Sequence, residues 1–121
     1  MSTIKVNSIE PANAGSEDYF LARAWVNFNG SGTVSVRDSG NVTSITDNGT
    51  GDWTLNFTNA FGASDYSVVG SAEYTPTVTA LSVVTLRTYA TSSVTINTSN
   101  SANGARTDPT LVSVLAHGDL A

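Results

Sequence analysis

Hydrophobic and polar positions alternate along most of the chain. In residues 24–28 the side chains of Ala24, Val26 and Phe28 alternate with Trp25 and Asn27, and residues 53–57 repeat this pattern. A period of two lets a strand bury one face and expose the other to water. No stretch has the 3.6-residue period and the caps of an amphipathic helix. The pattern therefore predicts short antiparallel strands.

Turns rich in glycine and asparagine separate the predicted strands. These residue types tolerate the positive φ of tight hairpins, and residues 24–57 are therefore predicted to form a strand-turn-strand meander. The turns fall at residues 29–32, 38–41 and 47–51. The first strand is expected over 19–29, and later strands over 66–72, 78–88, 93–97 and 110–117, with a long exposed loop at 98–109.

The number and spacing of these strands indicate an all-β fold. We expect an antiparallel β-sandwich or a jelly-roll-like barrel of about eight or nine short strands. Residues 19–121 would form this domain. Residues 1–18 show no sustained period and are interpreted as an extended arm outside it, with a frayed terminus as the alternative.

The aromatic residues are assigned by their place in this pattern. Trp25 shares a face with Leu21 and Arg23, opposite Ala24, so the first strand is either covered on both sides or presents one face to a neighbouring subunit. Core packing is favoured over sugar stacking for Trp25 and Trp53. Tyr74 and Tyr89, in or beside loops, are the preferred surface contacts. Phe61, before a glycine, is expected to tuck its ring under a turn.

Composition narrows the possible functions. Serine, threonine and asparagine make up 44 of the 121 residues, whereas charged residues make up 12% and the net charge is −5. The five cationic residues are scattered, which argues against nucleic-acid binding. Cysteine is absent, so there is no disulfide framework. No apolar run reaches the length of a membrane span, and the chain is expected to fold in the cytoplasm that makes it.

Candidate catalytic and metal-binding residues are few. His117 is the only histidine, and an edge position is favoured over a catalytic role. No cysteine or second histidine is available as a ligand for a transition metal. Residues 47–52 resemble a calcium loop only superficially, and a hairpin explains them. We therefore predict no catalytic residue, no metal and no cofactor. A glycan-processing enzyme, which would need paired carboxylates, is the rival hypothesis.

Two segments carry a resemblance to a known family. Residues 22–34 (ARAWVNFNGSGTV) and 41–57 (NVTSITDNGTGDWTLNF) resemble the carboxy-terminal knob domain of tail-fibre-type proteins of tailed bacteriophages, especially those infecting marine and cyanobacterial hosts. Residues 2–7 (STIKVN) resemble the amino-terminal start of such fibres. Longer family members place a shaft between these parts. This chain would be a fibre reduced to an attachment arm and a knob.

The resemblance implies a structural protein on the virion surface that forms a homotrimer, contacts other virion proteins of the capsid or tail, and reaches a host-surface glycan or protein. The alternative is a capsid decoration (cement) protein without a receptor. The arm would attach to the particle through Thr3, Ile4, Lys5 and Val6. The subunit interface would include Leu21, Arg23 and Trp25. The receptor candidates are Tyr74, Tyr89, Asn100, Asn103 and Arg106.

Overall fold

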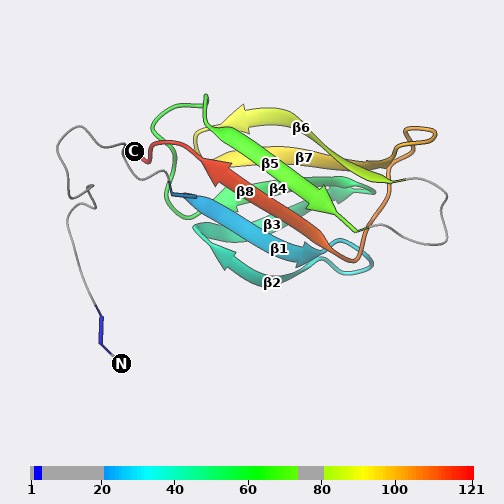
Figure 1. Ribbon diagram of the computed structural model, residues 1–121, viewed down its shortest axis with the longest axis horizontal. Coiled ribbons are helices and arrows are strands. Elements are labelled where there is room, and N and C mark those ends of the chain that lie inside the picture. The colour runs from blue at the N-terminus through cyan, green and yellow to red at the C-terminus, as the bar shows by residue number, and fades with distance from the viewer. Residues whose placement is uncertain (1, 4–20, 74–80) are drawn as a thin grey trace, which may run out of the picture.

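The computed structural model describes residues 2–3, 21–73 and 81–121, and in these ranges it contains eight strands and no helix (Figure 1). The strands form two four-stranded sheets, A and B, in which every paired neighbour is antiparallel. The predicted β-sandwich is therefore confirmed. Sheet A contains β1 (Ala24–Asn29), β2 (Ser35–Gly40), β5 (Ser67–Ala72) and β8 (Val112–His117). Sheet B contains β3 (Val42–Gly49), β4 (Asp52–Phe57), β6 (Ser82–Ala90) and β7 (Ser93–Asn100). The strand order is β2-β1-β8-β5 in sheet A and β3-β4-β7-β6 in sheet B.

The core lies between the two sheets and is supplied by alternate residues of the strands. Trp53 is fully buried and its ring meets that of Phe28 edge to face, with centroids 5.4 Å apart. This arrangement joins β4 of sheet B to β1 of sheet A and confirms the core position predicted for Trp53. The buried set also includes Ala24, Val26, Leu55, Val94, Ile96, Val112, Val114 and Ala116.

A second aromatic cluster fills one end of the sandwich. The rings of Phe61 and Tyr66 stack with centroids 4.2 Å apart, and Phe57 meets both edge to face. Phe61 is 1% exposed, which confirms that its ring tucks under the turn. The Tyr66 hydroxyl lies 2.8 Å from the carbonyl oxygen of Ala90 and 2.9 Å from that of Ser93, and burial raises the pKa of Tyr66 to about 12.

The predicted meander over residues 24–57 is wrong in one respect. β1 and β2 form a hairpin in sheet A, whereas β3 and β4 form a separate hairpin in sheet B. The chain crosses between the sheets at Asn41, which has a φ of 56° and exchanges hydrogen bonds with the backbone of Asn59. The next residue, Val42, is buried. Glycine and asparagine permit both a hairpin turn within one sheet and a crossing between two sheets, so the composition of the turns did not distinguish these two connections.

Several predicted boundaries also shift. β1 begins at Ala24, and residues 21–23 lie outside the strand; residues 19 and 20 fall outside the described ranges. β7 continues to Asn100, so residues 98–100 belong to a strand rather than to the predicted loop. Thr98 is fully buried and its hydroxyl donates to the carbonyl of Thr107. β6 ends at Ala90, and residues 78–80 are not described.

The predicted arm over residues 1–18 lies almost entirely outside the described residues. Thr3 is described and is exposed. Ile4, Lys5 and Val6 fall outside the described ranges, as does Tyr74. The arm and its attachment residues therefore stay predictions. Within the ranges that the structure does describe, no helix is long and apolar enough to cross a membrane.

Candidate functional site

The outer face of sheet A carries three exposed hydrophobic side chains in a row. Trp25 on β1 lies opposite Leu115 on β8, and Leu115 lies opposite Val69 on β5. These residues are 37%, 42% and 60% exposed, respectively. Each alternates along its strand with core residues, so all three point away from the sandwich interior. We call Trp25, Leu115 and Val69 the apolar band.

Trp25 is held against the sheet by a glycine on the neighbouring edge strand. Gly40 on β2 is its register partner, and a Cβ atom at Gly40 would lie 2.3 Å from Trp25 Nε1 and 2.9 Å from Cδ1. The five-membered part of the indole therefore covers the glycine backbone, as aromatic residues do beside edge glycines. The core position predicted for Trp25 is wrong: the side chain lies on the outer face of sheet A and is 37% exposed.

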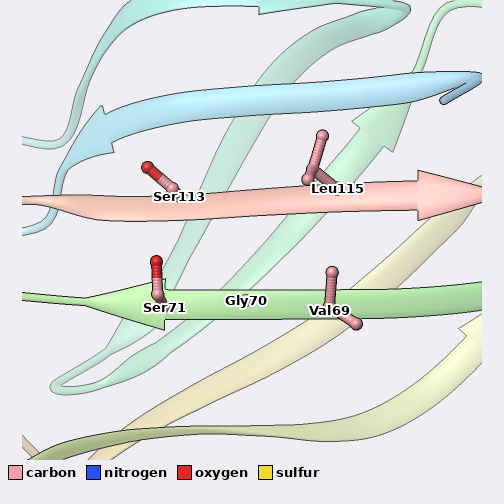
Figure 2. Close-up of a pocket in the computed structure, with 5 residues that line it drawn as sticks. All are labelled: Val69, Gly70, Ser71, Ser113 and Leu115. Atoms are coloured by element: carbon pink, nitrogen blue, oxygen red, sulfur yellow. The ribbon is translucent and has the colours of Figure 1, made fainter.

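A shallow hollow of about 180 Å³ adjoins the band between β5 and β8 (Figure 2). Val69 and Leu115 line one part of it, and the shorter side chains of Ser71 and Ser113 line the other, with Gly70 between. Pockets that enclose a drug-sized ligand measure roughly 300–1,000 Å³. The hollow is smaller than that and suits a single inserted side chain.

Polar contacts fix the sheet beside the band. Asn27 donates to the Ser113 hydroxyl at 3.0 Å, and Arg37 donates to Asn27 Oδ1 at 3.2 Å and to the carbonyl of Thr110. Glu73 accepts hydrogen bonds from the hydroxyl and the backbone N–H of Thr110. These bonds lower the pKa of the Glu73 carboxyl, with a smaller contribution from Arg37. Groups from β2 and from the end of β5 thus hold the segment that enters β8.

The outer face of sheet B has the opposite character. Its two central strands point only polar side chains outward, and some of these form hydrogen bonds with side chains on a neighbouring strand. Thr54 and Thr95 share a hydrogen bond of 3.1 Å, and Asn56 donates to Thr46 at 2.9 Å. The outward residues of β4 and β7 are Asp52, Thr54, Asn56, Ser93, Thr95, Asn97 and Ser99.

The predicted interface residues lie near one another. Arg23 is exposed, and its backbone N–H donates to the carbonyl of Ala116 on β8 at 2.9 Å, which extends the β1–β8 pairing by one residue. Leu21 is 51% exposed. Sequence reasoning did not include Leu115 and Val69 among the interface residues. The available signal was that Leu111 and Leu115 place apolar side chains on the face of their strand opposite to the buried valines.

The predicted receptor residues fall into two places. Tyr89 lies in β6 and is half-buried, with its ring 5.2 Å from that of Tyr66. Asn100 and Asn103 support a turn, because their Oδ1 atoms accept the backbone N–H groups of Ala102 and Ala105, respectively. Arg106 is exposed and follows the same turn.

His117 is exposed at the end of β8, opposite Ser67. Among the described residues there is no group of three histidine, aspartate or glutamate side chains that could hold a metal ion. No protein-family model, no curated protein and no solved structure matches the chain. The apolar band is the feature of the described surface whose chemistry most directly suggests a partner.

Proposed function

We propose that this chain is a non-enzymatic structural protein of a bacteriophage particle, a β-sandwich knob whose three copies contact one another through the apolar band. The observation that carries the proposal is the exposure of Trp25, Leu115 and Val69 in one row on the outer face of sheet A. The resemblance of residues 22–34 and 41–57 to phage fibre knobs supports the trimeric state and the particle.

The chemistry of the band favours a protein partner. Burial of apolar surface contributes about 25 cal/mol per Å², and tryptophan is enriched among the residues that dominate interface energies. Leu111, 39% exposed, precedes β8 on the same side as Leu115 and enlarges the apolar surface. The hollow beside Val69 would receive a side chain from the neighbouring copy. Leu21 and Arg23 would add contacts next to β1.

The trimer would display sheet B outward. Sheets A and B form the two layers of the sandwich (Figure 1), so the polar outer face of sheet B lies on the side away from the apolar band. Residues 1–18 would join the knob to other virion proteins, and the outward side would meet the host surface. The same trimer suits a position on the tail or on the capsid.

Light scattering on the purified protein tests the assembly directly. We expect a native mass of three times the 12.5-kDa chain mass. Leu115→Lys should reduce it to that of one chain, because burying an unpaired ammonium group in an apolar contact is strongly unfavourable. The matched control is Thr88→Lys, which places the same charge on the outer face of sheet B, opposite Thr95, and should leave the mass unchanged.

Two results would overturn the proposed interface. One is a wild-type protein that stays monomeric at all accessible concentrations. The other is a trimer that survives Leu115→Lys and dissociates with Thr88→Lys, since this would place the contact on sheet B. Circular dichroism on each variant establishes that the β-sandwich is intact before its mass is interpreted.

A further inference from the structure

Two arginine side chains from different parts of the chain converge on one carboxylate. Arg87 Nη1 lies 3.1 Å from Asp52 Oδ2, and Arg106 Nη1 lies 3.6 Å from the same oxygen. Asp52 is an outward residue of β4, so both guanidinium groups lie at the outer face of sheet B. We call Arg87 and Arg106 the arginine pair.

The fold aims each arginine at this point. Arg87 lies at a register shift in β6, where the extra residue of a β-bulge re-aims a side chain. It reaches β4 across β7, and Asn97, which lies between Asp52 and Thr85 in the register, is 2% exposed. Arg106 arrives from the segment after β7, where it pairs with Ser99 and donates to the carbonyl of Gly51 at 3.1 Å.

The arginine pair has more charge and more hydrogen-bond donors than Asp52 can satisfy. One carboxylate carries a single negative charge, whereas each guanidinium carries a positive charge and five N–H donors. The two side chains remain 54% and 41% exposed. The chain has a net charge of −5, and two of its five cationic residues meet here. Asp52 also accepts a hydrogen bond from Asn48 at 3.3 Å, and the Asp108 carboxylate accepts one from the N–H of Gly51. The two guanidinium side chains nevertheless keep exposed surface that a carboxylate of a ligand can reach.

We propose that the arginine pair binds the carboxylate groups of an acidic polysaccharide that contains uronic acid residues. Arginine binds carboxylates through two parallel N–H···O bonds, so it suits a uronate better than a neutral sugar. Neighbouring hydroxyl and amide groups of sheet B, among them Thr54, Thr95 and Asn56, would contact the sugar hydroxyls. The inference deepens the proposed function, because it names the chemical class of the glycan at the outward side of the knob.

Binding to polygalacturonate, measured by calorimetry at low ionic strength, is the first test. We expect binding of the wild-type protein, about tenfold or greater weakening in Arg87→Ala and in Arg106→Ala, and no binding to neutral dextran. The control is Arg37→Ala, which removes the same charge from the exposed face of β2 in sheet A and should leave the affinity unchanged. Added salt should weaken binding, since these groups are exposed. Equal affinity in all three variants would overturn the proposal.

Asp52→Asn separates a binding role from a purely structural one. Asparagine keeps the shape of the side chain but removes the carboxylate that competes with the ligand, so the affinity for polygalacturonate should rise severalfold. Asp65→Asn makes the same change of charge in the exposed segment between β4 and β5 and serves as the control. If the pair only ties loops together, Asp52→Asn will not bind more tightly than Asp65→Asn, and the proposal fails.

The result of the polygalacturonate experiments is independent of the light-scattering test of assembly. Binding that depends on the arginine pair in a monomeric protein would support this site and contradict the proposed trimer. A trimer that binds no polygalacturonate would support the apolar band and overturn this site. Tight binding of a sulfated polymer such as heparin, with none of polygalacturonate, would also overturn the assignment of a uronate ligand.

Discussion

The two sheets share one core but differ sharply on their outer faces. Sheet A presents the apolar band, with an indole lying across a glycine and a small hollow beside it. Sheet B presents rows of hydroxyl and amide groups that bond to each other, with the arginine pair at Asp52. Both are four-stranded antiparallel sheets, and this difference between their outer faces lies in the residues at their outward positions.

This difference separates two kinds of contact. An apolar face exposed to water has a free-energy cost that a protein partner removes, whereas a polar face is stable in water and binds through directed hydrogen bonds. The proposed contact with other copies of the chain would remove this cost at sheet A. The proposed polysaccharide site would use the second kind of contact at sheet B.

The largest expected effect distinguishes the two tryptophans. Trp53→Ala should lower the free energy of unfolding by about 3–5 kcal/mol, because it leaves a cavity beside Phe28. Trp25→Ala should cost about 1–2 kcal/mol, since an outward side chain leaves no enclosed cavity. Denaturant unfolding in the Leu115→Lys background measures both without a contribution from assembly. Equal losses would show that the band belongs to the core and would remove the contrast between the faces.

A smaller effect is expected where the indole lies on the sheet. Gly40→Ala places a methyl group where Trp25 Nε1 would be 2.3 Å away, so the ring must move off the edge strand. We expect a loss of about 1–2 kcal/mol and a red shift of tryptophan fluorescence. Gly62→Ala is the control, because the nearest described atom beyond its chain neighbours, the carbonyl oxygen of Asp119, lies 3.6 Å from its new Cβ. An unchanged spectrum in Gly40→Ala would contradict the packing described for Trp25.

The smallest expected effect on stability concerns Tyr66, in the interior between the two sheets. Tyr66 precedes β5 of sheet A, and its hydroxyl bonds to residues of sheet B. Its pKa in the folded protein is raised from 10 to about 12, so between these values the unfolded chain loses the proton first. Stability is therefore fully present below pH 10 and declines as the pH rises toward 12.

Tyr66→Phe removes the hydroxyl group and therefore tests both its hydrogen bonds and its effect on the pH dependence of stability. The variant should lose about 1 kcal/mol at neutral pH through the missing hydrogen bond, and its stability should decline less steeply between pH 10 and 12. Urea unfolding at a series of pH values gives both quantities. A wild-type protein and a variant with identical slopes in this range would contradict the assigned pKa.

The sequence predicted most of what depends on local pattern. Alternation identified the strands around Val26, Leu55 and Val114, because inward and outward positions follow directly from a period of two. The same alternation had already placed Trp25 opposite Ala24. The core assignment failed because it gave more weight to the size of the indole than to the face it occupies.

The rest depends on long-range geometry. The crossing at Asn41 requires a choice between two sheets that the turn residues alone do not determine. The position of Arg87 beside Asp52 depends on the sheet order and on a register shift in β6, neither of which is visible in a linear pattern. Arg106 was identified as a surface residue, but its partner 54 positions earlier in the chain was not.

The central position of β1 in sheet A has a mechanical consequence. β1 is hydrogen-bonded along one edge to β2 and along the other to β8, with five register pairs on each side. A force that pulls residue 21 away from the far end of the sandwich acts along β1, nearly perpendicular to those hydrogen bonds. Both ladders are then loaded in shear and must yield together rather than one bond after another. A sandwich tethered at residue 21 would therefore resist tension applied between that residue and its far end.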